Sequence, residues 1–424
     1  MIQLGATSPL DNVSYEDLYA RWEKGNWRAT ELDFTVDKEQ WETQFSDLER
    51  AAALWNYSLF FWGEDAVADG LSPYIGAAPL EEQKYFLATQ QVDEARHAVF
   101  FKRFMTEVAG VGGSSTGDAL TAIKPQLTWG FTKVFDRLEL MSEELRRDRS
   151  ITKLAQAITL YHIVIEATLA QPGQHFITSY LEDRKLLPGF REGMENVATD
   201  EQRHIGFGVK MLSDLRKMDP DVPAAVADLL REVIPWTASV LIPPNWDERY
   251  IECFGFTMAD IGEEGATSLE TKLRTAGMPI DGLPGPPIFA ISGTPRERAI
   301  IGKRMVKAGY LGEKLGPPST EREDMRLLFE AVASGLDVSK SPGSGTIQWD
   351  FPDAEPWHVV VDNGSTRAEP GRVTDPTVTL RARFEDFVDV TSKRVDPRRL
   401  ALRGGLRPSG DVRWLWRARR MFPS

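Results

Sequence analysis

The sequence predicts a mainly α-helical protein, in which a four-helix bundle is followed by a small α+β domain. Long amphipathic segments with few breakers fill the region from about Lys38 to Met218, which is typical of packed helices. Within that region the phrase Asp-Glu-x-Arg-His occurs twice, at residues 93–97 and 200–204. After Met278 the pattern changes to short strand-like runs between turn residues. These observations separate a helical domain from a mixed one.

Breaker residues divide the helical region. Pro79, the Gly-rich stretch 110–115 and the Leu-Pro-Gly sequence at 187–189 lie between long segments with helical periodicity. The expected helices span residues 38–70, 79–109, 119–147, 151–182 and 188–217, and further helical patterns lie near 221–241 and 246–277.

Two Pro- and Gly-rich loops, 282–287 and 316–319, indicate a domain boundary. We therefore predict a first domain over residues 1–280, a linker over 281–319 and a second domain over 320–424. In the second domain Asn363-Gly364 is a hairpin-type turn, and the mixed pattern is typical of an α+β fold. The expected elements are a helix near 321–335, strands at 346–351, 357–362 and 377–383, a helix near 384–394, an element at 398–403 and a last helix from about 411.

The composition narrows the class of protein. The chain has 424 residues, and its 42% hydrophobic and 27% charged content is that of an ordinary globular protein. A net charge of −13 argues against a nucleic-acid partner, because phosphate binding requires a basic surface. The single Cys253 excludes an internal disulfide framework. Residues Met1–Leu10 do not resemble a secretory signal, and no apolar run is long enough for an integral membrane segment, so we expect a cytoplasmic protein.

The repeated phrase carries the chemistry. A Glu and a His three residues apart lie on one face of a helix, about one turn apart. Glu64 precedes the first Glu-x-x-His by 30 residues and Glu166 precedes the second by 35, which suggests a duplicated helix pair. Two such pairs in a four-helix bundle form the inward-facing ligand set of a dimetal site, and four carboxylates with two imidazoles suit iron or manganese. The candidate metal ligands are Glu64, Glu94, His97, Glu166, Glu201 and His204.

A single Glu-x-x-His pair is more often a solvated surface pair, and the full set decides between the two interpretations. Only five His occur in the chain, and two of them stand in matching phrases. Asp93 and Asp200 are candidates for orienting the histidines from outside the metal site, Asp93 on His204 and Asp200 on His97, with solvated acids as the alternative. Arg96 and Arg203 either neutralise these aspartates or lie on the surface.

At these residues the chain resembles the ribonucleotide reductase small-subunit superfamily of the ferritin-like fold, and more closely the R2-like ligand-binding oxidases. The resemblance covers roughly residues 20–240 and includes Gly63–Val67, Tyr161–Glu166 and Leu187–Gly189. It implies a heterodinuclear Mn/Fe cofactor, although two Fe suit the same ligands. Some carboxylates would bridge the metals, a long-chain fatty acid would bind nearby, and a homodimer is expected. The first metal site would comprise Glu64, Glu94 and His97, and the second Glu166, Glu201 and His204.

Val67 and Tyr161 stand where these oxidases carry a valine and a tyrosine that an oxidatively formed ether bond joins. Ordinary core packing is the alternative for both. The chain departs from the oxidases at Gln171–His175, which changes the expected pocket, and Pro172 is expected to kink the helix. His175 is either a pocket acid/base or a structural residue. Phe101 stands where reductase subunits typically carry a radical-storing tyrosine, which argues against that function.

The region 320–424 resembles the sterol carrier protein 2 type of domain, and the matching segments are 375–380, 384–387, 395–397 and 402–406. This resemblance implies an apolar cavity for a lipid or another hydrophobic molecule, with a dimerisation or packing module as the alternative. Arg413–Arg420 is basic and aromatic, so it is either a membrane-surface contact or an ordinary amphipathic terminal helix.

Together these features predict a dinuclear metal oxidase or oxygenase that activates O2 for two-electron oxidation of a hydrophobic, fatty-acid-like substrate. Three alternatives stay open. They are a lipid-binding or sensing protein whose metals are structural or used once, a diiron N-oxygenase, and a ribonucleotide reductase small subunit.

Overall fold

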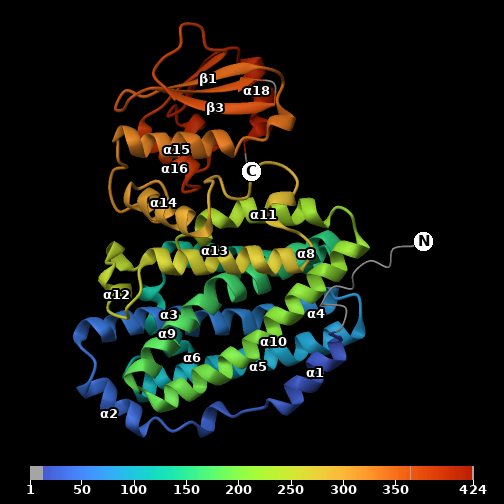
Figure 1. Cartoon of the computed structure of the whole chain (residues 1–424), viewed down its shortest axis with the longest axis vertical. Helices are drawn as coiled ribbons and strands as arrows, with labels where there is room; N and C mark the ends of the chain where they lie inside the picture. The colour runs from blue at the N-terminus through green and yellow to red at the C-terminus, as the bar shows by residue number, and fades with distance from the viewer. Residues whose placement is uncertain (1–12, 363, 423–424) are drawn as a thin grey trace. The chain divides into compact units, whose positions relative to one another are not determined.

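The computed structural model describes residues 13–362 and 364–422, so the predictions for Met1–Leu10 and for Asn363 lie outside the described residues. The chain forms two compact units (Figure 1). The first contains the described residues up to Val226 together with Leu241–Pro279, and the second contains Ala227–Val240 and the chain from Ile280. The segment 281–319, expected to be a linker, contains helix α14 (Pro295–Lys307) and belongs to the second unit.

The first unit is a helical bundle, as predicted. Helices α3 (Asp47–Gly70) and α5 (Glu81–Glu107) pack against each other, and α10 (Pro188–Met218) packs against α5 and against the π-helical segment η4 (Thr159–Ala170). In Figure 1, α3, α5 and α10 run through the centre of this unit. The surrounding helices are α1 (Tyr15–Lys24), α2 (Thr35–Thr43), α4 (Ser72–Ala77), α6 (Thr116–Ile123), α7 (Trp129–Arg147), α8 (Ile151–Ile158), α9 (Gln171–Arg184), α12 (Arg249–Glu252) and α13 (Met258–Thr275), and α11 (Val222–Thr237) continues into the second unit.

Local capping explains where two of the bundle helices begin. The predicted helix 38–70 is divided, because the Ser46 hydroxyl accepts from the Glu49 amide while the Glu49 carboxylate accepts from the Ser46 amide, and this capping box starts α3. At the start of α10, the buried Asp37 carboxylate accepts from the amides of Gly189 and Phe190 at 2.9 and 2.7 Å. A Cβ atom at Gly189 would lie 2.1 Å from a backbone oxygen, so only glycine fits there.

The helix expected over residues 151–182 differs most from its prediction. One helix was expected over 151–182, and the chain instead runs through α8, the twelve-residue π-helix η4 and α9. Pro172 lies in the first turn of α9, directly after the π-helical segment. Proline is tolerated in a first turn, so the irregularity that we expected at Pro172 lies in the preceding segment. π-helices are rare and are frequent at functional sites.

The second unit is a small α+β fold. Its five-stranded sheet has the order β3-β2-β1-β4-β5, in which β1 and β4 are parallel and the other pairs are antiparallel. Phe329 stacks on Trp357 and on Phe387 at 5.0 and 5.2 Å, so aromatic rings fill the core. The strands are β1 (Gly345–Asp350), β2 (Trp357–Asp362), β3 (Ser365–Pro370), β4 (Val378–Arg381) and β5 (Arg407–Gly410), and the helices besides α14 are α15 (Arg322–Ser334), α16 (Phe384–Thr391), α17 (Pro397–Leu402) and α18 (Val412–Ala418).

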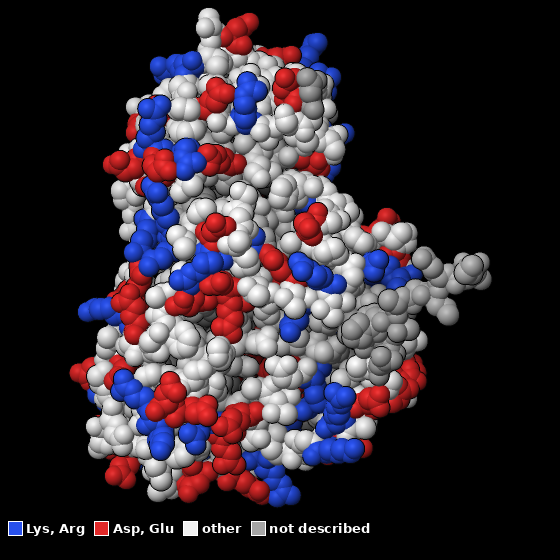
Figure 2. Space-filling view, in the orientation of Figure 1, with Lys and Arg blue, Asp and Glu red and all other residues white. Residues whose placement is uncertain are grey.

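The predicted fold class is confirmed in both units. β3 and β5 were not predicted. On the face in Figure 2, acidic and basic side chains are interspersed over each unit. Among the described residues, no helix combines the length and the apolar character needed to cross a bilayer.

Candidate metal centre

Four buried segments each bring part of the candidate ligand set to the centre of the bundle. Glu64 comes from α3, and Glu166 comes from η4. The first Glu-x-x-His lies on α5 and the second on α10. The six side chains meet although they come from distant parts of the chain, and all are at most 6% exposed: Glu64, Glu94, His97, Glu166, Glu201 and His204.

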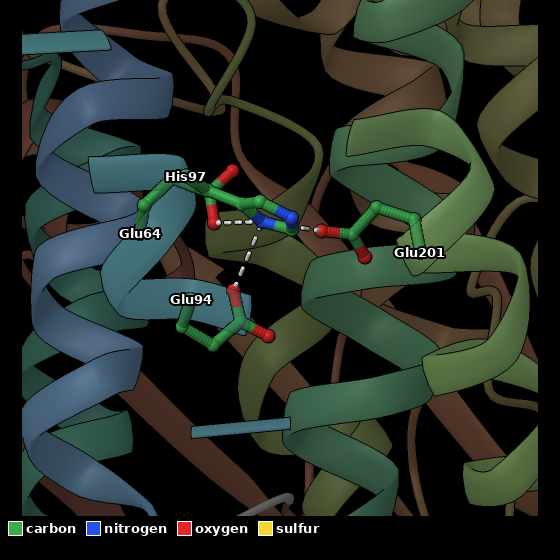
Figure 3. Close-up of side chains that lie close together, drawn as sticks. All are labelled: Glu64, Glu94, His97 and Glu201. Atoms are coloured by element: carbon green, nitrogen blue, oxygen red, sulfur yellow. Dashed lines mark hydrogen bonds and ion pairs between the residues drawn. The ribbon is translucent and has the colours of Figure 1, made fainter. Parts of the chain in front are cut away.

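Three carboxylates surround His97 (Figure 3). Its Nδ1 lies 3.2 Å from Glu64 Oε2, 3.5 Å from Glu94 Oε2 and 3.8 Å from Glu201 Oε1. His204 has a matching environment, since its Nδ1 lies 3.2 Å from Glu94 Oε1, 3.6 Å from Glu166 Oε1 and 3.8 Å from Glu201 Oε2. Each histidine therefore presents Nδ1 to the carboxylates.

Glu94 and Glu201 each direct one oxygen towards each histidine, which is the geometry of bridging carboxylates. Glu64 approaches only His97, and Glu166 approaches only His204. The potential ligand atoms form two groups that share Glu94, and these groups are Glu64, Glu94, His97 and Glu201, and Glu94, Glu166 and His204. Glu201, which the resemblance assigned to the second site with some carboxylates bridging, is grouped here with the first.

The unsatisfied atoms of this cluster fit a pair of cations. Glu166 Oε2, Glu201 Oε2 and His204 Nδ1 are buried and make no hydrogen bond within the described structure. Buried polar atoms without partners are costly, and four carboxylates close together repel one another. Two divalent ions would balance the four charges and use these atoms. Oxygen and nitrogen donors without thiolates suit iron and manganese.

The pKa values show the same demand for positive charge. Burial raises the pKa of Glu64, Glu166 and Glu201 above the ordinary range. Burial alone would lower the pKa of His97 and His204, but neighbouring carboxylates, Glu64 and Glu94 foremost, raise it well above its ordinary value. In the metal-free protein, protons therefore take the place of metal charge.

Two aspartates contact the far side of the histidine rings, in a crossed arrangement. His97 Nε2 lies 3.2 Å from Asp200 Oδ2, and His204 Nε2 lies 3.1 Å from Asp93 Oδ2. Arg96 and Arg203 each pair with both aspartates, and both arginine side chains are at most 10% exposed. The arginines are therefore buried partners of the aspartates and not surface residues.

Two tryptophans complete this outer arrangement. Trp22 Nε1 donates to Asp93 Oδ1 and Trp27 Nε1 donates to Asp200 Oδ2, both at 2.8 Å. Trp27 also stacks on the His97 ring with a centroid distance of 6.2 Å. Each aspartate thus contacts one histidine and one tryptophan, Asp93 through two different oxygens and Asp200 through the same oxygen.

The buried side-chain amide of Gln90 links the residues around Glu166. Gln90 Nε2 donates to Tyr161 Oη at 2.9 Å and to Glu166 Oε1 at 2.8 Å. Gln90 Oε1 lies 3.1 Å from His162 Nε2, and burial lowers the pKa of His162 to about 3, so this imidazole is neutral and donates to the amide oxygen. With Gln90 fixed in this way, Tyr161 donates its hydroxyl proton to Glu94 Oε1 at 2.6 Å.

Val67 and Tyr161 line one small cavity together. Its volume is about 10 Å³, enough for about one water molecule, and its walls are mainly apolar. Tyr74 also lines it, and the Tyr74 hydroxyl makes no hydrogen bond within the described structure. The complete lining comprises Val67, Gly70, Leu71, Tyr74, Leu138, Ser142 and Tyr161.

Two other predicted positions lie away from the cluster. The His175 side chain is 58% exposed, and its Nδ1 lies 3.1 Å from Glu264 on α13, so it is a surface contact and not a pocket residue. Phe101 is fully buried and stacks on Phe60 at 5.6 Å.

The sequence interpretation missed Gln90, Trp22 and Trp27. Gln90 stands four residues before Glu94 and therefore shares its helix face, which was a usable signal. The two tryptophans reach the site from near α1, and no local pattern links them to residues 93 and 200.

Comparison with known proteins agrees with the resemblances predicted for both regions. Residues 7–236 match the family described as ribonucleotide reductase, small chain, and residues 338–422 match the SCP-2 sterol transfer family. Among solved structures, the chain is similar to an R2-like ligand-binding oxidase from Sulfolobus acidocaldarius, with 24% identity and a TM-score of 0.54 over 70% of this chain and 96% of that one. It is also similar to a variant R2-like ligand-binding oxidase with an anaerobically reconstituted Mn/Fe cofactor, with 21% identity and a TM-score of 0.54 over 62% of this chain and 93% of that one. At these identities the structural likeness establishes the fold.

Proposed function

Because this chain belongs to the ribonucleotide reductase small-chain family, we propose that it is an O2-dependent dimetal oxidoreductase. One observation carries the proposal: two buried histidines share two carboxylates, and each has a further carboxylate of its own. In this proposal Glu64 and His97 would hold one metal and Glu166 and His204 the other, with Glu94 and Glu201, which lie near both histidines, as further ligands.

When bound, the metal pair would supply electrons to O2 and the oxidising power for a C–H bond. The protein contributes position, charge and dryness. Asp93 and Asp200 accept hydrogen bonds from the Nε2–H groups of His204 and His97, which leaves each Nδ1 available as a metal ligand. The Tyr161 hydroxyl donates to Glu94 and thereby holds a proton beside the carboxylate that both groups of potential ligands share. Complete burial of the cluster excludes bulk water.

For the metals we propose manganese and iron, with two irons as the alternative, since both pairs accept these donors. The solved R2-like ligand-binding oxidases with Mn/Fe cofactors support the first choice through their fold. Element-resolved analysis of protein loaded with both metals tests it. One manganese and one iron per chain supports Mn/Fe, and two irons with manganese excluded contradicts it.

For the substrate we propose a hydrophobic molecule of the fatty-acid class. The match of residues 338–422 to a sterol transfer family supports this choice.

We also propose that Val67 and Tyr161, which line one cavity, become joined by an ether bond. The phenol oxygen would bond to a Val67 carbon with loss of two hydrogens, while two electrons pass to O2. A cytoplasmic homodimer remains our expectation for the assembly.

The experiment is anaerobic loading with Mn²⁺ and Fe²⁺ followed by exposure to O2. We expect new visible absorption from an oxidised metal pair in the wild type and none in the Glu94→Ala variant. Wild-type protein that binds two metals and shows no oxygen-dependent change would contradict the oxidoreductase.

The small cavity favours a second candidate function, a lipid-binding or sensing protein whose metals are used once. A cavity of about 10 Å³ does not hold a long-chain acid without rearrangement, whereas it places Val67 beside Tyr161. Mass spectrometry separates the two functions. Loss of two hydrogens from the Val67 and Tyr161 peptides without turnover of added fatty acid favours the single-use site, and repeated turnover favours the oxidase.

A further inference from the structure

The chain from Arg398 to Arg420 is strongly basic within an acidic protein. It contains eight arginines and one acidic residue, Asp411, whereas the whole chain has a net charge of −13. Within the described structure, none of these eight arginines forms an ion pair. Arginines elsewhere in the same unit are paired, as Arg326 is with Glu323 and Glu330. Unpaired charge of one sign indicates an anionic partner from outside the chain.

This segment also exposes apolar side chains. It runs through α17, the edge strand β5 and α18, and every residue of β5 is exposed. Leu402 at the end of α17 is 89% exposed. In α18, Trp414 and Ala418 are buried, while Val412 and Trp416, four residues apart, are 51% and 59% exposed.

Arginines accompany the exposed apolar pair of α18. Arg413 and Arg417 are also four residues apart, so they form a second exposed row on the helix. The Arg419 guanidinium lies 4.4 Å from the centre of the Trp416 ring. One side of α18 is therefore anchored in the core by Trp414 and Ala418. The other side exposes Trp416 among arginines.

We propose that Arg398–Arg420 is a docking surface for an anionic lipid membrane. Arginines attract the acidic headgroups, and each basic residue near such a surface strengthens binding by a factor of about five. Tryptophan and leucine enter the boundary between headgroups and acyl chains, where amphipathic aromatic side chains are favoured. A nucleic acid would complement the arginines but leave Leu402, Val412 and Trp416 exposed to water, so the apolar residues favour lipid.

Co-sedimentation of the full-length protein with vesicles tests this surface without any metal or turnover. Vesicles of phosphatidylcholine alone are compared with vesicles in which about one third of the lipid is phosphatidylserine, at an ionic strength of about 0.1 M. We expect binding only to the anionic vesicles, and binding should weaken at about 1 M salt because charge is screened.

A matched pair of variants locates the surface. Changing Arg413→Glu with Arg417→Glu should weaken vesicle binding by about 30-fold or more. The control changes Arg322→Glu with Arg326→Glu on the solvent-facing side of α15, which has the same charge change and the same spacing and should leave binding unaltered. A second pair compares Leu402→Ser with Trp416→Ser, expected to weaken binding about tenfold, against Ile300→Ser with Leu315→Ser, two exposed residues of the same unit, expected to have no effect.

The outcomes are decisive in either direction. The proposal is overturned if wild-type protein does not sediment with anionic vesicles, or if each control variant weakens binding as much as its partner. It is also overturned if the protein binds a single-stranded oligonucleotide more tightly than the vesicles and the serine variants do not alter that binding. Circular dichroism of each variant confirms that a loss of binding is not a loss of folding.

Discussion

The two halves of the candidate metal centre contain the same types of potential ligand in different surroundings. Each half contributes one Glu and one Glu-x-x-His, and the aspartates before the two motifs cross over to the opposite histidines. The first Glu, Glu64, stands on a regular α-helix, whereas Glu166 stands on the π-helix η4. The ligand set is therefore close to symmetric, while the backbone that carries it is not.

Corresponding positions show what the asymmetry does. Tyr161 stands five residues before Glu166, and the matching position before Glu64 is the apolar Leu59. Gln90 stands four residues before Glu94, and the matching position before Glu201 is Val197. The amide donates to Glu166, and the phenol donates to Glu94 Oε1, the oxygen that lies near His204, so polar hydrogen bonds concentrate on the second half. Two metals bound here would have different surroundings in spite of similar ligands.

The largest effect is expected where the halves join. Glu94→Ala removes the carboxylate that both groups share, so we expect binding to fall from two metal ions per chain to nearly none. Glu64→Ala and Glu166→Ala are the matched controls, and each should retain about one ion. Stoichiometry is measured by element analysis after gel filtration. A Glu94→Ala variant that keeps one tightly bound ion would show that the halves are independent.

The crossed aspartates should act on opposite halves. Asp200→Asn should weaken the metal held by His97, and Asp93→Asn the metal held by His204, each by about 10–100-fold. Calorimetric titration with Mn²⁺ separates the two steps. Asp37→Asn is the control, because Asp37 is equally buried but caps α10 away from the ligands, and it should lower stability without changing either affinity. Equal weakening of both metals by each variant would contradict the crossed arrangement.

The symmetric features were accessible from the sequence and the asymmetric ones were not. Side chains at fixed helical spacing share a face, so the sequence predicted that Glu94 and His97 lie together. The duplicated phrase in turn predicted that the two aspartates contact the opposite histidines. The π-helix was not predicted because nearly every residue of 159–170 is buried. A segment that is buried on all sides shows no apolar periodicity that would distinguish a π-helix from an α-helix. Trp22 and Trp27 were missed because their contacts depend on tertiary packing.

In the second unit the same distinction holds. The strand β2, a mainly apolar run with three consecutive valines, was predicted closely. The edge strand β5 has the sequence Arg-Pro-Ser-Gly and no buried residue, so it carries no strand pattern and owes its conformation to pairing with β4.

The metal-free protein should become less stable as the pH rises. His97 and His204 have raised pKa values in the folded state, because neighbouring carboxylates outweigh burial, so the folded state binds more protons than the unfolded state. Their stabilising contribution is complete below about pH 6.5 and is lost as the pH rises through the folded-state values. We expect the melting temperature to fall by about 2–4 °C for each kcal/mol lost.

Metal should reverse this dependence, because metal ions compete with protons for the same ligand atoms and bind more tightly at higher pH. Melting curves between about pH 6 and 9 with and without Mn²⁺ provide the measurement. The single variants His97→Gln and His204→Gln should each remove part of the slope. A metal-free protein whose stability rises over this range would contradict the protonated state of both halves.

The smallest effect is expected from a substitution that makes the two halves more alike. Gln90→Val introduces the residue type found at the matching position 197 and leaves Tyr161, Glu166 and His162 without their amide partner. We expect a loss of about 1–3 kcal/mol in stability and weaker binding of the metal beside Glu166, with the other metal unaffected. The control is Gln83→Val, because Gln83 is another fully buried glutamine of α5 that bonds Tyr15 away from the ligands. The amide sets the difference between the halves if both variants lose stability alike but only Gln90→Val changes one metal-binding step in the titration. If Gln90→Val changes both steps equally, the difference between the halves is assigned to the π-helix alone.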